Sequence, residues 1–513
     1  MIKRFDNLCL PVNRPESDLK IMVEKKARAK AKYFKILKKS LDARDKRNIF
    51  WTYSVAFSSS EEAEPQPEHA RVKNPPRVAV IGGGPAGLFC AVRLIEHGFS
   101  PVIIERGESV EDRRISCLNF FENRVLSPES NVQFGEGGAG AFSDGKLNTR
   151  TKDGLNRDVL KIFVRFGAPE DILYVNKPHV GSDGLYGVLQ NLRAFVTANG
   201  GSYLFDTKVV DIRVKDGELK SLILKNTKNG EESDFPVDLA VLAVGHSARD
   251  TYEILNARGV IMQPRDFAVG VRIEHLAESI NFAQYGESRV YLPAADYQLV
   301  SHAHERTVFT FCMCPGGVVI PAASEAGGVV VNGMSMRARD GVNSNSALMV
   351  QMRLSDFGGG DLFAGVRFQR EIERKAFEAG GGNYKAPCQL FGDFAAGRLS
   401  QSFGEVNPTY AAGVSFAPLD AVLPKTAASA LKAAIPDMAK KLKGFDSASA
   451  VLTGAETRFS SPVKILRGED FQSVTVKNLY PCGEGAGYSG GITSSAADGL
   501  NTAEKIFARF FQG

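Results

Sequence analysis

Residues 77–107 of this sequence, RVAVIGGGPAGLFCAVRLIEHGFSPVIIERG, contain the pattern that decides the fold. The stretch begins with a short apolar, β-branched run, which is typical of a buried parallel strand. This run ends in Gly82-Gly83-Gly84-Pro85-Ala86-Gly87, which matches G-x-G-x-x-G, and a helix is predicted over residues 85–97. A second apolar strand is predicted over residues 101–104 and leads to Glu105.

Each part of this unit has a role in binding an adenine dinucleotide. Gly82 permits the tight turn, Gly84 lets the backbone approach a pyrophosphate, and Gly87 lets the helix pack against the sheet. The start of the helix directs its N–H groups at the phosphates. The Glu105 carboxylate would accept both ribose hydroxyls and repel a 2′-phosphate. Because all the parts occur in order, the unit predicts an adenine dinucleotide site rather than a glycine-rich turn without a ligand.

Length and composition set the broad class. A chain of 513 residues predicts two or three domains, and 43% hydrophobic with 24% charged residues is ordinary for a soluble globular protein. No apolar run reaches the roughly 18–20 residues of a membrane span, so no membrane association is expected. The seven cysteines are scattered and lack zinc spacing, which favours a reducing, cytoplasmic setting.

The net charge of +5 comes from the amino-terminal segment. Residues 1–60 predict a basic α+β module with a β-α-β-β order, a partial ferredoxin-like sandwich, followed by a polar, Pro-rich linker over residues 61–76. The Lys and Arg residues of the module are compatible with RNA or an acidic partner. A solvated helix face and hairpin turn is the favoured interpretation, because charge runs alone are weak evidence.

Two further regions predict ligand contacts. Residues 135–146 are too rich in glycine for a stable helix or strand, and the flanking Phe134 and Phe142 favour backbone pressed against a flat ligand over a loose linker. Residues 238–245 form a second buried strand, whose carboxyl end would place His246 at the ligand crevice. A lone histidine is more often structural than catalytic.

The pattern then changes to short alternating strands, which predict an antiparallel sheet inserted into the α/β domain. The domains expected are an α/β domain over residues 77–262 and 441–513 and the inserted domain over residues 263–440. The strands expected outside the first unit are residues 202–214, 219–225, 268–274, 290–292, 298–301, 307–313, 318–321, 328–333 and 474–480. The helices expected are residues 153–167, 185–198, 344–354, 361–379 and 493–511.

Cys312 and Cys314 form a C-x-C pair on one of these strands. In a regular strand both thiols lie on the same face, two residues apart, in poor geometry for a disulfide. Buried core thiols are therefore favoured over a functional disulfide.

Near the carboxyl terminus, residues 482–492 (CGEGAGYSGGI) follow a strand and precede a helix. Glu484 would offer a carboxylate to hydroxyl groups, and the helix start would offer N–H groups to an electron-rich ring edge.

Taken together, Gly82–Gly87, Glu105, the strand ending at Gly245 and the late Gly483-Glu484 resemble a flavoprotein of the glutathione-reductase type. Five longer strings are similar to a bacterial family of uncharacterised FAD-dependent dehydrogenases, and this resemblance covers nearly the whole chain. The strings are NVQFGEGGAGAFSDGKL, FAVGVRIEH, TFCMCPGGVVIPAAS, NGMSMRARDG and LYPCGEGAGYSGGITSSAADG.

The resemblance implies an α/β fold: an FAD/NAD(P)-binding Rossmann-like domain with an inserted antiparallel-sheet substrate domain and the small α+β module. It further implies non-covalent FAD, with Glu484 at the ribityl chain, residues 490–492 at the pyrimidine edge, residues 135–146 along the isoalloxazine, and Val209 and Val210 on the adenine side. The cofactor-binding residues expected are Ile81, Gly82, Gly83, Gly84, Pro85, Ala86, Gly87, Glu105, Arg106, Gly137, Gly138, Ala139, Gly140, Ser143, Asp144, Lys146, Val209, Val210, Ala243, Gly245, Gly483, Glu484, Gly490, Gly491 and Ile492.

The function expected is an FAD-dependent oxidoreductase that transfers a hydride to or from a small molecule held under the antiparallel sheet. The sequence holds no second strand-GxGxxG-helix unit, so NAD(P)H would act only as a transient reductant over the flavin. The alternatives are a flavoenzyme acting on RNA through the basic module, a flavin-binding protein without turnover, and a reductase of long prenyl chains. The candidate catalytic residues, chosen from strand ends and loops, are His179, His246, Arg272, His275 and Arg458.

Overall fold

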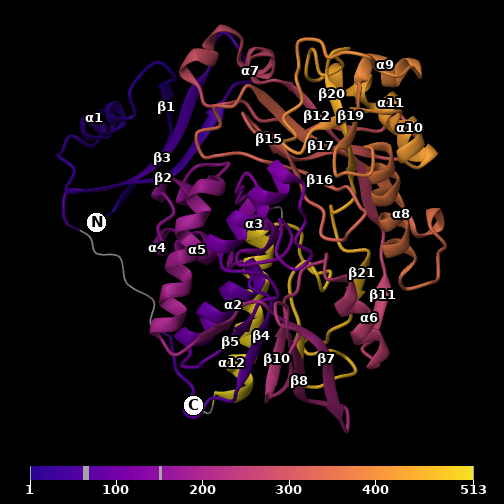
Figure 1. Ribbon diagram of the computed structural model, residues 1–513. Helices are drawn as coiled ribbons and strands as arrows, with labels where there is room; N and C mark the ends of the chain where they lie inside the picture. Colours follow the sequence, from indigo (N-terminus) through magenta and orange to yellow (C-terminus); the bar gives the residue numbers. More distant parts are fainter. Residues whose placement is uncertain (1, 62–68, 150–152, 512–513) are drawn as a thin grey trace.

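The computed structural model describes residues 2–61, 69–149 and 153–511. Figure 1 shows a parallel sheet with its helices, a larger antiparallel sheet beside it, and a small amino-terminal module at one side. Part of the linker expected over residues 61–76 lies outside the described residues. Within the described residues, no helix is both long and apolar enough to cross a membrane.

A five-stranded parallel sheet forms the centre of the first domain. Its strand order is β22-β10-β4-β5-β6. The strands are β4 (Val78–Ile81), β5 (Val102–Ile104), β6 (Ser202–Leu204), β10 (Leu239–Leu242) and β22 (Leu479–Pro481). Strands β4, β10 and β22 are buried along their whole length, because both faces of the sheet are covered, which explains their continuous apolar runs.

Helices cover one face of this sheet, and a second, smaller sheet covers the other. The helices are α2 (Pro85–Glu96), α4 (Asn156–Arg165), α5 (Gly181–Ala198) and α12 (Ile492–Phe510). The opposite face packs against α6 (Arg249–Ala257) and the antiparallel strands β7 (Thr207–Lys215), β8 (Glu218–Asn226) and β9 (Glu232–Pro236). The predicted single strand over residues 202–214 is wrong, because the chain turns at Asp206 (φ 50°) and places β6 and β7 in different sheets.

A seven-stranded sheet forms the second domain, in the order β13-β14-β17-β12-β20-β18-β19. All neighbouring strands are antiparallel except the parallel pair β18 and β19. The strands are β12 (Phe267–Leu276), β13 (Val300–Ser301), β14 (Val308–Cys314), β17 (Asn343–Met352), β18 (Ala386–Leu390), β19 (Val414–Phe416) and β20 (Val451–Glu456). Because β20 belongs to this sheet, the sheet continues past the predicted domain boundary at residue 440.

Helices pack around the seven-stranded sheet, and two short antiparallel strand pairs form separate two-stranded sheets (Figure 1). The helices are α7 (Ala277–Tyr285), α8 (Ala364–Ala379), α9 (Phe391–Ala396), α10 (Leu419–Val422) and α11 (Lys425–Ala439), and α3 (Val110–Asn123) lies between the two domains. The pairs are β15 (Val318–Pro321) with β16 (Val331–Met334) and β11 (Met262–Pro264) with β21 (Val463–Ile465). Short 3-10 helices occur at Gly138–Phe142, Glu170–Leu173, Gly286–Tyr291 and Leu354–Asp356.

Three predicted elements are wrong. The helix predicted over residues 344–354 is the central strand β17, where pairing with β12 and β14 overrides the helix propensity of Ala, Leu and Met. The strand predicted over residues 290–292 begins in a 3-10 helix. The strand predicted over residues 474–480 is reduced to β22.

The amino-terminal module has the predicted β-α-β-β order. Its elements are β1 (Lys3–Pro11), α1 (Ser17–Ala27), β2 (Tyr33–Asp42) and β3 (Phe50–Ser58), and β3 lies between β1 and β2 in the sheet. Leu19 and Val23 of α1 pack on this sheet. The edge of β2 exchanges backbone hydrogen bonds through Lys39 with Tyr174 and Asn176, which docks the module onto the first domain.

Close packing of α2 against α12 gives a first test of the fold. A Cβ atom at Gly499 would lie 2.1 Å from the Ala86 carbonyl oxygen, whereas one at Gly187 of α5 would meet nothing within 4 Å in the described part of the chain. We expect Gly499→Ala to lower the free energy of unfolding by about 1–3 kcal/mol through overpacking. The control Gly187→Ala should raise it by about 0.5–1 kcal/mol, because alanine is the better helix former. Urea unfolding measures both, and equal effects would contradict the packing.

Candidate functional site

One large cavity lies where the carboxyl end of the parallel sheet meets the seven-stranded sheet. Its volume is about 1240 Å³, and it is lined by the ends of β4, β5 and β10, the starts of α2 and α12, and strand β14. Sites for a single small ligand are commonly about 300–1,000 Å³. The cavity therefore has room for more than one small ligand.

The starts of α2 and α12 both open on this cavity. Among the described residues, no side chain caps either helix, at Gly84 for α2 or at Gly491 for α12. The free N–H groups and the helix dipole make each start a site for negative charge. A Cβ at Gly490 or Gly491 would meet nothing within 4 Å of described residues, so this backbone faces open space. Both starts thus fit the phosphate and electron-rich ring edge of a dinucleotide cofactor.

The Glu105 carboxylate, at the carboxyl end of β5, organises the surrounding backbone; we call this part of the cavity the nucleotide end. It is buried and accepts hydrogen bonds from the N–H groups of Gly83 at 2.7 Å, Gly107 at 3.0 Å and Gly135 at 2.9 Å. A carboxylate has about four acceptor positions, so these three bonds leave capacity for a ligand hydroxyl. Glu105 lines the cavity, and its contact with ribose remains a prediction.

The glycine-rich loop is held by one buried guanidinium. Arg113 of α3 is 0% exposed. It donates five hydrogen bonds to loop carbonyl groups, at 2.6–3.3 Å. The acceptors are the carbonyl oxygens of Asn131, Val132, Gly135, Glu136 and Gly138. These hydrogen bonds fix the shape of the glycine-rich loop. The loop contacts Glu105 through the Gly135 N–H and borders the cavity.

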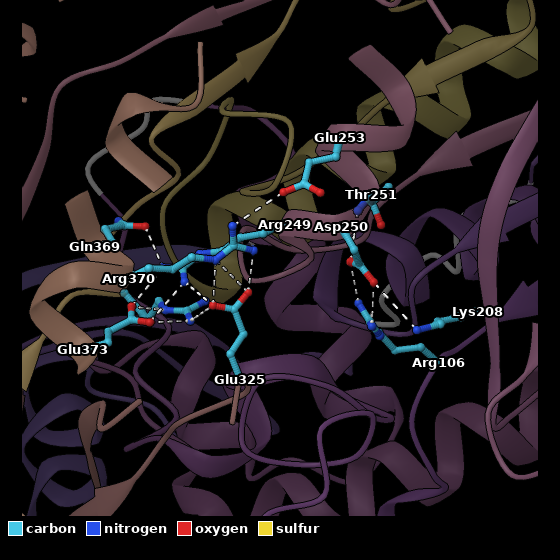
Figure 2. A network of polar contacts seen from close by, with 11 residues as sticks. Arg106, Lys208, Arg249, Asp250, Thr251, Glu253, Glu325, Gln369, Arg370 and Glu373 are labelled. Carbon is cyan, nitrogen blue, oxygen red and sulfur yellow. Dashed lines mark hydrogen bonds and ion pairs between the residues drawn. The ribbon is translucent and has the colours of Figure 1, made fainter. Parts of the chain in front are cut away.

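A buried network of charges connects the two domains beside the cavity, and Figure 2 shows its members from α6 and α8. Glu373 of α8 binds Arg249 at 2.9 and 3.1 Å and Arg458 at 2.8 and 3.1 Å. Burial alone would raise the pKa of the Glu373 carboxyl, but the two guanidinium groups outweigh it and lower the pKa to about 2. A second group in Figure 2 joins Arg106, Asp250 and Lys208 at the nucleotide end.

His246 lies on the cavity wall, and its ring is neutral at physiological pH. Burial and then the positive charges of Arg458 and Arg249 lower the pKa of His246 to about 3. Its Nε2 is 3.2 Å from the Arg458 carbonyl oxygen, which can only accept, so Nε2 carries the proton. Its Nδ1 is left as an acceptor, 3.5 Å from Glu484 Oε1.

Glu484 is the group in this pair that titrates near neutral pH. Burial raises the pKa of its carboxyl to about 7, although the N–H of Gly491 opposes the shift by stabilising the carboxylate. Glu484 can therefore hold or release a proton at the start of α12 while His246 accepts a hydrogen bond from it.

Most of the predicted site residues line this cavity. They are Ile81, Gly82, Gly84, Pro85, Ala86, Glu105, Arg106, Gly138, Ala139, Gly140, Ser143, Asp144, Lys146, Val209, Ala243, Gly245, His246, Arg458, Glu484, Gly490, Gly491 and Ile492. Their roles toward a cofactor remain predictions.

Eight predicted residues are not on the cavity wall. Gly83, Gly87, Gly137, Val210 and Gly483 lie behind it, where Gly83 and Gly483 donate to Glu105 and Asp498. His275 is buried against the Phe445 carbonyl oxygen at 2.9 Å, and His179 faces the Arg337 carbonyl oxygen at 3.3 Å. Arg272 is 0% exposed and pairs with Glu456. The structure therefore does not bring His179, Arg272 and His275 to the cavity as catalytic groups.

Sequence reasoning missed an aromatic group on the cavity wall. Phe309 and Phe311 of β14 pack edge-on against Phe459, with ring centres 5.3 and 4.5 Å apart. Alternation along the strand indicated which residues share a face, but the contact with Phe459 depends on chain segments far apart in sequence. Glu456 and Asn332 also line the cavity and were not predicted.

The C-x-C segment departs from the regular strand expected for it. The register between β14 and β17 shifts by one residue between Phe311 and Cys314, and Cys312 has φ 42°. This is a β-bulge, which re-aims side chains. Cys312 lines the cavity, whereas Cys314 is buried, and all seven cysteines are free thiols. The expectation that both are core thiols is therefore wrong for Cys312.

The fold and this site define a dinucleotide-binding α/β protein with a second domain that closes the cavity. Two family models match: residues 76–260 match pyridine nucleotide-disulphide oxidoreductase, and residues 266–459 match the FAD-dependent protein, C-terminal domain-like family. An uncharacterised protein of Clostridium beijerinckii is 46% identical over 497 residues, which cover 93% of this chain and 92% of that protein. The chain belongs to this family of FAD-dependent proteins, and FAD is its cofactor.

Solved structures with a similar arrangement are distant. The flavin-dependent brominase Bmp2 is 12% identical, with a TM-score of 0.40, over 85% of this chain and 79% of that chain. The glycerol-3-phosphate dehydrogenase from Bacillus halodurans complexed with FAD is 11% identical, with a TM-score of 0.38, over 85% and 65%. The reaction of this protein does not follow from either likeness.

Removing the Arg113 guanidinium should destabilise the protein. We expect Arg113→Met to lower the free energy of unfolding by about 3 kcal/mol or more, because it leaves buried carbonyl groups without donors. The neighbouring Arg114 is exposed, and Arg114→Met should change stability by less than about 1 kcal/mol. Urea unfolding of both variants tests this, and a small effect of Arg113→Met would show that the loop does not depend on it.

The raised pKa of Glu484 predicts a pH-dependent effect of Glu484→Gln in the FAD-free protein. A carboxyl pKa that folding raises from 4.5 to about 7 means that the folded state holds a proton which the unfolded state has lost. The wild type therefore loses stability as the pH rises through this window, and the variant does not. We expect the stability of the variant relative to wild type to increase by roughly 2–3 kcal/mol between pH 4.5 and 7.5. Parallel stability curves would contradict the shift.

Proposed function

We propose that the cavity is the FAD site and that the protein transfers a hydride between FAD and a small molecule held beneath the seven-stranded sheet. The observation that carries this proposal is that two uncapped helix starts and the glycine loops open on a single cavity. That cavity continues to the aromatic group of Phe309, Phe311 and Phe459. In this proposal, the cofactor site and the substrate space are joined in one cavity.

The cofactor would be held along the parallel sheet. Residues 82–86 and the start of α2 would bind the diphosphate, and Glu105 would bind the adenosine ribose. Glu484 and residues 490–492 would hold the ribityl chain and the ring edge. When bound, FAD would supply the hydride chemistry, in which two electrons are accepted or donated as a hydride. Binding is expected to be non-covalent.

The chain's own residues would bind the substrate and take up or release protons. The phenylalanine group offers apolar and aromatic surface on which a substrate is oriented. Arg458 carries a positive charge on the wall and is fixed by Glu373. Glu484, with its pKa of about 7, can hold a proton beside the neutral His246. These groups would provide charge and a proton at the cavity wall.

Gly84→Ala tests the cofactor site with little effect on the fold. The added Cβ would contact the Gly138 Cα at 3.7 Å, which is ordinary van der Waals contact, but it would stand where α2 begins at the cavity. We expect the FAD-free variant to lose at most about 1 kcal/mol of stability. Its Kd for FAD should rise at least about tenfold, a change of 1.4 kcal/mol. Gly187→Ala, which lies on α5 and is not on the cavity wall, should bind FAD as the wild type does.

The outcomes of that titration separate the alternatives. Unchanged FAD affinity in Gly84→Ala would contradict the placement of the diphosphate. Anaerobic addition of NADH or NADPH to the loaded protein then tests turnover. Bleaching by one of them would support a reductase and identify its donor. A flavin that no added donor or acceptor cycles at a useful rate would favour the binding protein without turnover.

Action on RNA is the alternative that involves the amino-terminal module. The module is docked by Lys39 onto residues 174–176, and Asn176 and Lys177 line the cavity, so the module lies close to the cavity wall. Salt-sensitive RNA binding that is lost on removing residues 2–58 would favour this alternative. RNA binding that is absent in the full chain would exclude it.

A further inference from the structure

The bulge in β14 places two cysteines together at the cavity wall. A bulge inserts one extra residue and bends the strand, which removes the regular geometry that disfavours a bond between thiols two residues apart. The Cys314 thiol donates a hydrogen bond to the Cys312 carbonyl oxygen at 3.3 Å, so the bulge turns the Cys314 side chain back towards Cys312. Cys312 lines the cavity, and Cys314 is buried behind it.

Two cationic side chains fix this segment. Arg272 donates from Nη1 to the Cys312 carbonyl oxygen at 2.8 Å, and Lys146 of the glycine loop donates to the Met313 carbonyl oxygen. Arg272 is itself held by Glu456. The loop expected along the flavin ring therefore touches the C-x-C segment directly.

The charges around Cys312 favour its thiolate. Hydrogen bonding from Cys314, together with the charges of Arg272 and Lys146, outweighs burial and lowers the pKa of Cys312 to about 6. The thiolate is the reactive form in thiol–disulfide chemistry. Glu484, Glu456 and Asp144 are the acidic groups that face this position.

We propose that Cys312 and Cys314 form a redox-active dithiol–disulfide pair that exchanges two electrons with the FAD bound in the cavity. In the reducing direction, two electrons reach the disulfide and the S–S bond breaks. One of two protons makes the Cys314 S–H bond, and the other goes to Cys312 or, where Cys312 stays a thiolate, to solvent. The same two electrons and two protons leave the reduced cofactor. The site would then hold two groups that each accept two electrons, FAD and the disulfide, and the disulfide would lie beside the substrate space. This inference rests on the proposed FAD site.

Peptide mapping tests whether the bond forms, without any measurement of activity. One tryptic peptide, residues 307–337, contains both Cys312 and Cys314 and no other cysteine. After mild oxidation of the native protein with diamide, unfolding and alkylation, we expect this peptide to be unalkylated and lighter than the reduced peptide by two hydrogen atoms. A peptide that is alkylated twice after oxidation, or joined to another cysteine peptide, would overturn the proposal.

An anaerobic dithionite titration of the FAD-loaded, oxidised protein tests electron exchange. We expect wild type to consume twice as many electrons per flavin as Cys312→Ser or Cys314→Ser, because each variant lacks the disulfide. Cys9→Ser removes an exposed cysteine outside the cavity and should match wild type. Equal electron uptake by wild type and both variants would overturn the pair while leaving the FAD site intact. A protein that binds no FAD would instead overturn the proposed function.

Discussion

The Arg113 guanidinium satisfies backbone that the glycine-rich loop cannot satisfy by itself. A loop near Gly135 and Gly138 has few side chains, so its carbonyl groups need donors from elsewhere. Arg113 provides five donors in a fixed planar fork and gathers those carbonyls around one point. The Glu105 carboxylate complements Arg113, because it accepts hydrogen bonds from backbone N–H groups of the same region. The cofactor cavity therefore has a wall of ordered backbone instead of a mobile loop.

The second domain is attached to the first domain by buried charge as well as by apolar packing. Glu373 comes from α8, whereas its partners Arg249 and Arg458 follow β10 and β20. Removing one partner from such a group leaves an uncompensated buried charge, which costs about 3–5 kcal/mol. The position of Arg458 on the cavity wall thus depends on the packing of α8, and the substrate space is not free to change independently of the fold.

The sequence predicted the parts of the site that are local in the chain. Gly84, Glu105 and Glu484 were found because a strand end, a glycine turn and a helix start follow one another within a few residues. β17 was mistaken for a helix because its Ala, Leu and Met residues favour helices, and its strand conformation comes from pairing with β12 and β14. The bulge at Cys312 was not predictable, since it depends on the register between two strands more than thirty residues apart.

The ion pair of Arg272 with Glu456 fixes the backbone at this bulge. Burial raises the pKa of the Glu456 carboxyl to about 7, so ionising this carboxyl costs more free energy than ionising an exposed one. Buried ion pairs of this kind are often no more stabilising than apolar residues of the same volume. Stability alone therefore does not account for the pair. Its direct effect is on geometry, because Arg272 holds the Cys312 carbonyl oxygen and Glu456 fixes Arg272 from the other side. The buried pair therefore positions a cavity-lining thiol, as the proposed dithiol–disulfide chemistry requires.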